Sequence, residues 1–168
     1  MKKPNVTLYY AILIFSLLLA GCISDEKPRQ EEQDRQIIAQ MSLEWAVLDK
    51  NIPDYNLIRD KDNIFLSNRN IDKSYNFSLE NITISILTPE EIKQKSEAEG
   101  DFLYLEFEKI DISSRGATVK LNNIWAQNET SRKTIAYLSG GEATIPFTKE
   151  GDRWVRQISQ SPGFHKLK

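Results

Sequence analysis

The 168-residue chain has one cysteine and one histidine, and this scarcity excludes several classes of site. A single cysteine cannot form an internal disulfide, and the two residues together are too few for a His/Cys zinc site. His165 lies in the C-terminal tail, so a Ser-His or Cys-His catalytic pair would have to recruit it from outside the predicted sheet. We therefore expect no metal site, no cofactor and no nucleophilic catalytic set.

Two further features are missing, a basic block and a long hydrophobic run. The formal net charge is −2, and the basic residues are not gathered between aromatic residues as in nucleic-acid-binding domains. The apolar stretch from Leu8 to Ala20 is interrupted by Ser16 and is shorter than the roughly 20 residues of a membrane-spanning helix. The sequence therefore predicts neither a nucleic-acid partner nor a spanning helix.

The same apolar stretch follows two lysines and ends in Leu19-Ala20-Gly21-Cys22. A basic start, an apolar middle and small residues at the end are the parts of a secretory signal. The last four residues resemble the lipobox of bacterial lipoproteins. The resemblance implies cleavage between Gly21 and Cys22, and a diacylglyceryl thioether on Cys22 with fatty acyl chains such as palmitate. An uncleaved membrane helix and a small buried core cysteine are the alternatives, and the small residues before Cys22 favour the lipoprotein.

The resemblance also implies a location, the bacterial cell envelope, with the membrane as a partner through the lipid on Cys22. Two or more acyl chains anchor a protein stably. Position 23 is Ile and not the Asp that commonly retains such proteins at the inner membrane. An outer-membrane destination is therefore allowed in a Gram-negative organism, and the outer face of the plasma membrane is expected otherwise.

The composition divides the chain into four parts. Residues 1–21 are the expected signal peptide, and residues 22–35 are the lipidated cysteine and a flexible tether, because this stretch is almost entirely polar. Residues 36–160 are long enough for a single domain with its own core. Residues 161–168 are the expected C-terminal tail.

Periodicity predicts the elements of that domain. Apolar residues recur at helical spacing along one stripe, which predicts a helix ending near Asp49; the stripe consists of Ile37, Ile38, Met41, Trp45 and Leu48. A short helix from Pro89 to about Ala98 is predicted by Thr88 and Glu91, which form a capping box. Alternation predicts strands near residues 64–66, 82–86, 102–110, 117–121, 134–138, 143–148 and 154–158, with a polar loop over 128–133.

This order of elements predicts an α+β fold in which the N-terminal helix packs on a curved antiparallel sheet, with one short second helix. The arrangement resembles the cystatin and NTF2-like superfamily. The two hairpins, between Glu99 and Trp154, are also similar to those of small uncharacterised bacterial proteins, a likeness that implies no activity.

Aromatic and acidic residues are the candidates for a site. Tyr104, Trp125 and Trp154 would line a cavity between helix and sheet, or lie in the core. Glu106 and Glu108 lie on the same face of the predicted strand, about 7 Å apart by strand rise. They would act as a paired acid and base, or form a cross-strand charge ladder with Lys109 and Lys120. We favour the ladder; burial of one glutamate would favour the pair.

We therefore expect a membrane-anchored, non-enzymatic envelope protein that binds a small ligand or a protein. One alternative is an NTF2-like enzyme that uses acids such as Glu106 or Asp111 on a small molecule. Another is a structural protein that assembles through an exposed sheet edge.

Overall fold

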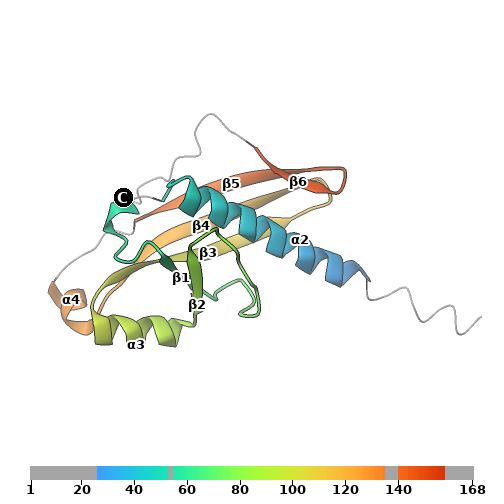
Figure 1. Ribbon diagram of the computed structural model, residues 1–168. Coiled ribbons are helices and arrows are strands. Elements are labelled where there is room, and N and C mark those ends of the chain that lie inside the picture. The colour runs from blue at the N-terminus through green and yellow to red at the C-terminus, as the bar shows by residue number, and fades with distance from the viewer. Residues whose placement is uncertain (1–25, 53–54, 135–139, 158–168) are drawn as a thin grey trace, which may run out of the picture. The chain divides into compact units, whose positions relative to one another are not determined.

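The computed structural model describes residues 26–52, 55–134 and 140–157 (Figure 1). The chain divides into two compact units, residues 1–34 and 35–168. The predicted signal peptide, Gly21, Cys22 and the tail with His165 lie outside the described residues. Within the described ranges, no helix is long and apolar enough to cross a membrane.

The first described element is helix α2, Glu26–Leu43, which continues into a π-helical turn, η1, Glu44–Leu48. The expected flexible tether is therefore wrong for residues 26–35, which are helical. Their Glu, Gln and Arg side chains are good helix formers. Pro28 lies in the first turn, where its missing N–H needs no helical partner.

The buried face of this helix differs from the predicted stripe. Ile37 is 47% exposed, whereas Ile38 is fully buried. Two small residues, Ala39 and Ser42, complete the buried face, and the Ser42 hydroxyl donates to the Ile38 carbonyl at 2.8 Å. Because neither is a large apolar residue, the hydrophobic pattern does not reveal this face.

The π-helical turn shifts the face again. The Asp49 N–H donates to the Glu44 carbonyl, five residues earlier, at 3.4 Å. This wider turn places three consecutive residues, Trp45, Ala46 and Val47, in the core. The Asn51 side chain donates to the Trp45 carbonyl at 2.9 Å. It thereby gives a hydrogen-bond partner to one of the carbonyls near the end of the helix.

Six strands form one curled sheet in the order β2-β1-β3-β4-β5-β6. Their bounds are β1 Asn63–Ser67, β2 Thr83–Leu87, β3 Phe102–Ile112, β4 Gly116–Ala126, β5 Gly141–Glu150 and β6 Arg153–Arg156. The three strands β3, β4 and β5 are long and make the centre of the sheet, and β1 and β2 extend it on one side.

The sheet is mixed and not antiparallel as predicted. β1 pairs in parallel with both β2 and β3, whereas β3 to β6 pair antiparallel. Long connections, residues 68–82 and helix α3, return the chain in the same direction each time. Alternation along a strand does not report the direction of its neighbour, so the sequence does not distinguish the two cases.

The second helix, α3, Pro89–Glu99, is confirmed with its capping box. The Thr88 hydroxyl accepts from the Glu91 N–H at 3.2 Å, and the Glu91 carboxylate accepts from the Thr88 N–H at 2.7 Å. Gly100 follows with a φ of 86°, a left-handed conformation that glycine adopts without strain.

The predicted loop over 128–133 is instead a short helix, α4, Glu129–Thr134. The Asn128 side chain accepts from the Ser131 N–H at 2.8 Å and caps it. Thr134 ends this helix, and the rest of the predicted strand 134–138 lies outside the described residues. A single turn, η2, Tyr55–Leu57, precedes β1.

The two faces of the sheet are covered differently. From Arg35 onward, α2 and η1 lie along one face (Figure 1) and bury the larger apolar cluster, which includes Ile38, Leu105 and Val119. Helix α3 covers part of the other face through a smaller cluster of Ile92, Phe102 and Ala126. The expected α+β class, with the N-terminal helix on the sheet, is therefore confirmed.

Candidate functional site

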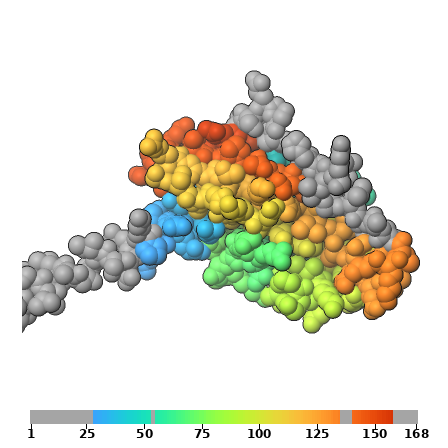
Figure 2. All heavy atoms as spheres, turned by 180° about the vertical axis from the view of Figure 1, so that it is seen from behind, coloured from blue at the N-terminus to red at the C-terminus, as the bar shows by residue number. Residues whose placement is uncertain are grey.

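Strands β3, β4 and β5 have one face turned away from α2. The part of this face that α3 does not cover carries polar side chains. Figure 2 views the molecule from behind Figure 1, and atoms of these strands reach the surface there, in yellow to orange-red.

Ion pairs and hydrogen bonds join two sets of side chains on this face, Glu106 with Arg69 and Glu108 with Lys120 and its neighbours. The two sets are adjacent because Glu106 is opposite Asn122 in the pairing of β3 and β4. Tyr104 is included because the charges of Glu106 and Arg69 act on its pKa. We call the whole group the Glu106 cluster; its members are Arg69, Tyr104, Glu106, Glu108, Lys120, Asn122 and Glu142.

Glu106 is the buried acid of this cluster, with 8% of its surface exposed. Arg69 Nη1 lies 3.2 Å from Glu106 Oε1 and donates a hydrogen bond to it. A buried carboxylate without a partner would be strongly unfavourable, so the guanidinium is what makes this position tolerable. Arg69 comes from the turn after β1, and its own side chain is 66% exposed.

Tyr104 precedes Glu106 on the same face of β3. Burial raises the pKa of the Tyr104 hydroxyl, because the phenolate would lose its hydration. The negative charge of Glu106 raises this pKa further, and the positive charge of Arg69 opposes the shift. The Tyr104 hydroxyl therefore keeps its proton to a higher pH than an exposed tyrosine would.

The remaining members form a ladder around Lys120 of β4. Its Nζ lies 3.5 Å from a Glu142 oxygen and 3.8 Å from a Glu108 oxygen. The Asn122 amide donates to Glu108 Oε2 at 3.4 Å, while Asn122 Oδ1 is buried and has no hydrogen-bond partner among the described residues. The expected charge ladder is thus present at Lys120 with Glu108 and Glu142. Glu106 is not part of this ladder; it is buried and pairs with Arg69, which is the outcome that favours the paired acid and base.

Lys109, the other lysine of the expected ladder, pairs with Asp111 at 2.8 Å. This follows from a β-bulge between Phe107 and Lys109, which shifts the alternation of side chains by one residue. As a result both Phe107 and Ile110 are buried in the larger cluster. The bulge also leaves two carbonyls that accept from Asn70 Nδ2, Phe107 O at 3.0 Å and Glu108 O at 2.8 Å.

The three aromatic candidates do not lie together. Tyr104 contacts the smaller cluster, under α3, whereas Trp125 and Trp154 belong to the larger cluster on the opposite face. Trp154 is buried, and Lys149 Nζ lies 5.1 Å from the centre of its ring. The indole nitrogen of Trp154 has no hydrogen-bond partner in the part of the chain that the structure describes. Because the sheet separates Tyr104 from the two tryptophans, one small ligand cannot contact all three.

Two of the surface hollows are lined entirely by described residues, and neither of these two lies between α2 and the sheet. One, of about 390 Å³, lies at the turn between β3 and β4; its lining includes Asp111, Ser113, Thr118, Pro146, Phe147 and Gln157. The other, of about 570 Å³, follows the outer side of α3. None of the three aromatic candidates lines either hollow.

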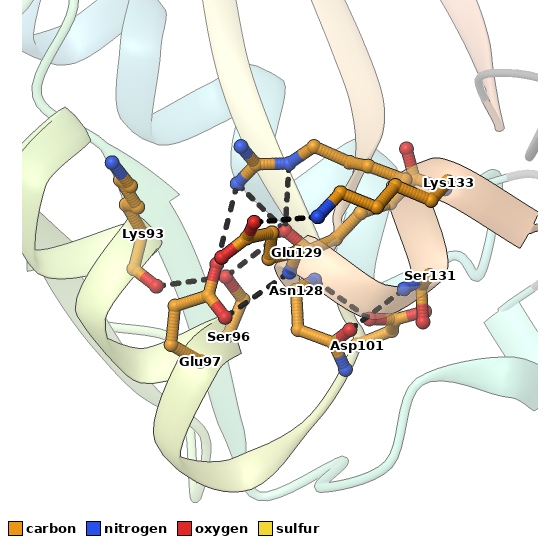
Figure 3. Close-up of polar contacts among 10 residues, drawn as sticks. Lys93, Ser96, Glu97, Asp101, Asn128, Glu129, Ser131 and Lys133 are labelled. Carbon is orange, nitrogen blue, oxygen red and sulfur yellow. Dashed lines mark hydrogen bonds and ion pairs between the residues drawn. The ribbon is translucent and has the colours of Figure 1, made fainter.

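Figure 3 shows a second polar group, at the corner between α3 and α4. Glu97 Oε2 accepts from the Glu129 N–H at 3.1 Å, and Asp101 Oδ1 accepts from the Asn128 N–H at 2.9 Å. Arg132 donates to the Gln127 carbonyl at 2.8 Å. The first two bonds satisfy free N–H groups at the start of α4, and Arg132 also lies 3.7 Å from Glu97 of α3. Because these contacts hold α4 against α3, we assign this corner a structural role.

Within the described ranges, no three acidic, histidine or cysteine side chains are grouped so that they could hold a metal ion. Sequence reasoning missed Arg69 and Asn122, which are 37 and 16 positions from Glu106. Arg69 contacts Glu106 and Asn122 contacts Glu108 only because the sheet brings these segments together. No family model, curated protein or solved structure matches this chain.

Proposed function

We propose that this chain is a lipid-anchored protein of a bacterial envelope whose folded unit binds a partner protein and catalyses no reaction. The observation that carries the proposal is Cys22, placed directly after Leu19-Ala20-Gly21 at the end of an apolar segment. A diacylated cysteine would hold the protein on a membrane without further contacts. The membrane would be the outer membrane, or the outer face of a single plasma membrane.

The preference for a protein partner over a small ligand rests on the core. Between α2, η1 and the sheet, large side chains such as Leu43, Leu105 and Phe107 are at most 1% exposed. Small-ligand sites are usually concave and enclosed, whereas both hollows described above are open to the surface. The outer faces and edges of the sheet are therefore the better candidates for binding.

The cystatin or NTF2-like arrangement is part of the proposal. It is supported by a helix lying along one face of a curled sheet whose strands β3 to β6 are antiparallel. The parallel strands β1 and β2 are a departure from the expected arrangement.

An enzyme is the second candidate, because Glu106 is buried beside Tyr104. It predicts that Glu106→Gln abolishes the cellular role while stability and partner binding stay unchanged. Under our proposal, Glu106→Gln changes the cellular role only as far as it weakens folding or binding.

The anchor is tested by labelling cells with a radioactive or clickable palmitate analogue. Wild-type protein should incorporate label, and Cys22→Ser should remain an unlabelled, uncut precursor. Ser24→Ala is the matched control, because it alters a hydroxyl two positions away and leaves the cysteine in place. Equal labelling of wild type and Cys22→Ser would refute the lipoprotein assignment.

Partner binding is tested by placing a photo-crosslinking residue at exposed positions on different elements of the full-length protein in its own bacterium. Thr83 lies in β2, Lys93 in α3 and Thr144 in β5, and all three are exposed. We expect one position to yield a defined protein adduct that the other two do not. Absence of an adduct at every position would refute the partner-binding part of the proposal.

A further inference from the structure

Several stretches of strand edge have no neighbouring strand among the described residues. The four longest are the outer edge of β2, the outer edge of β6, the part of β3 that extends past the end of β1, and the part of β5 before Phe147, which β6 does not reach. Unpaired strand edges pair readily with other chains, and proteins usually protect them with charge or with side-chain caps.

Three of these edges are protected. β6 has only four residues, and two of them are Arg153 and Arg156. The free part of β5 contains Glu142 and Pro146, and the Pro146 carbonyl already accepts from the Gln157 N–H at 2.9 Å.

Along the free part of β3, Asn70 donates to two carbonyls at the bulge, and Arg35 Nη1 donates to the Ile110 carbonyl at 3.3 Å. A strand added at any of these three edges would have to displace these side chains or accommodate their charges.

The β2 edge has neither kind of protection. Its sequence, Thr-Ile-Ser-Ile-Leu, contains no charge and no proline. Two hydrogen bonds show which of its residues face β1: the Thr83 N–H donates to Asp62 O, and Leu87 O accepts from the Asn68 N–H, both at 2.8 Å. The backbone N–H and C=O groups of successive residues in a strand point to opposite sides. The backbone groups of Ser85 therefore also point toward β1, and those of Ile84 and Ile86 point outward.

The outward edge of β2 therefore offers two N–H donors and two carbonyl acceptors, those of Ile84 and Ile86. No hydrogen bond in the described part of the chain uses these four groups. The side chains of Ile84 and Ile86 are partly exposed and lie on the apolar cluster under α2. An added strand would thus find backbone partners together with an apolar surface on one side.

Acidic residues flank this edge at both ends. At the start of β2, Asp60, Asp62 and Glu80 are exposed and form no ion pair within the described residues. Of the two cations beside them in the sequence, Lys61 lies over the Tyr55 ring and Arg59 donates to the Glu99 and Asp101 carbonyls. At the other end, Glu90 is exposed just beyond β2. The flanks therefore favour a strand with basic residues at its own ends.

We propose that β2 is the docking edge for the partner, which adds an extended segment with alternating apolar residues and flanking lysines or arginines. This inference rests on the proposed function, since it names the surface and the chemistry of the protein partner. Main-chain hydrogen bonds supply the affinity in strand addition, and the alternate side chains supply the specificity.

A second copy of this chain is a poorer occupant. Two β2 strands related by a two-fold axis pair antiparallel, which places the start of one beside the end of the other. Asp62 and Glu80 of one copy would then lie near Glu90 of the other, and no unpaired basic cluster at either end would compensate. Like charges at such positions oppose association.

The test measures binding of a fluorescent peptide, Lys-Lys-Val-Thr-Val-Thr-Val-Lys-Lys, to the full-length protein in a non-ionic detergent. The key variant is Ile84→Pro, which removes one outward N–H and no hydrogen bond to β1. The matched control is Ile84→Ala, which loses more of the side chain but keeps the N–H. Hydrogen exchange of β2 with and without peptide gives a readout that needs no variant.

We expect saturable binding that is about tenfold or more weaker for Ile84→Pro and within threefold of wild type for Ile84→Ala. The amides of Ile84 and Ile86 should exchange more slowly with peptide bound, and replacing the peptide lysines by glutamates should weaken binding. Absence of saturable binding, equal binding by Ile84→Pro, or protection at β3 or β6 in place of β2 would overturn the inference.

Two further outcomes separate the β2 edge, its occupant and the proposed function from one another. A full-length dimer that Ile84→Pro converts to a monomer would make a second copy the occupant and overturn the partner assignment. Failure of the peptide together with cross-links at Lys93 or Thr144 would reject the β2 edge while leaving the proposed function intact.

Discussion

Asn70 combines two stabilising roles that can be separated by mutation. It lies in the turn after β1, where the Ile71 N–H donates to the Asn68 carbonyl at 3.3 Å, and its φ is 62°. Asparagine tolerates this left-handed conformation better than most residues. Its side chain also donates to both carbonyls of the β3 bulge, at 3.0 and 2.8 Å. The turn and the bulge therefore depend on the same residue.

We expect Asn70→Ala to lower the free energy of unfolding by about 2–4 kcal/mol. The two lost hydrogen bonds account for about 1–2 kcal/mol, toward the low end of their range because the Glu108 carbonyl is exposed. The left-handed conformation costs alanine a further 1–2 kcal/mol, roughly. Asn70→Gly loses the hydrogen bonds but adopts this φ freely, so it should be less destabilising than Asn70→Ala by about 1 kcal/mol.

The assay is urea unfolding of the full-length protein in non-ionic detergent, followed by tryptophan fluorescence and extrapolated linearly. Asn70→Asp is the third variant: it tolerates the same φ but presents a carboxylate to two carbonyl oxygens, and it should destabilise at least as much as Asn70→Gly. The reasoning is refuted if alanine and glycine variants are equally stable, or if Asn70→Ala costs less than about 1 kcal/mol.

Two other predictions concern the Glu106 cluster and the start of β5. The pKa of Tyr104, followed by absorbance at 295 nm, should fall in Glu106→Gln, because this variant removes a nearby negative charge. It should rise further in Arg69→Ala, because this variant removes a nearby positive charge. A pKa that moves in neither variant would contradict the assigned causes. Gly140→Ala should destabilise by about 1–3 kcal/mol, because its Cβ would lie 2.6 Å from Asn123 Nδ2 and 3.0 Å from Asn123 O; urea unfolding equal to wild type would show that Asn123 yields without cost.

Local patterns predicted the elements whose stability is itself local. Helix α3 is confirmed because Thr88, Pro89 and Glu91 form its cap within four residues of sequence. The long strands β3 and β4 are confirmed because apolar residues alternate along one face of each, in β3 as far as the bulge after Phe107. The capping role of Asn128 is equally local, and the short helix it begins was missed because six polar residues carry no apolar periodicity.

The candidate site depended on contacts distant in sequence. Glu106 stands out in the sequence as an acid in a strand, but its burial and its pairing with Arg69 arise only when the turn after β1 reaches β3. Tyr104 and Trp154 are aromatic residues of similar appearance in the sequence, and only the sheet places them on opposite faces.

The sequence by itself determined the helices and strands that caps and periodicity encode, and it alone supports the lipid anchor proposed at Cys22. Tertiary structure decided that Ile38 and not Ile37 faces the core, because a π-helical turn and two small residues set the buried face. It also decided that β1 and β2 run parallel, because the direction of a strand depends on the path of its connections and not on its own side chains. The open edge of β2 is a consequence of that path.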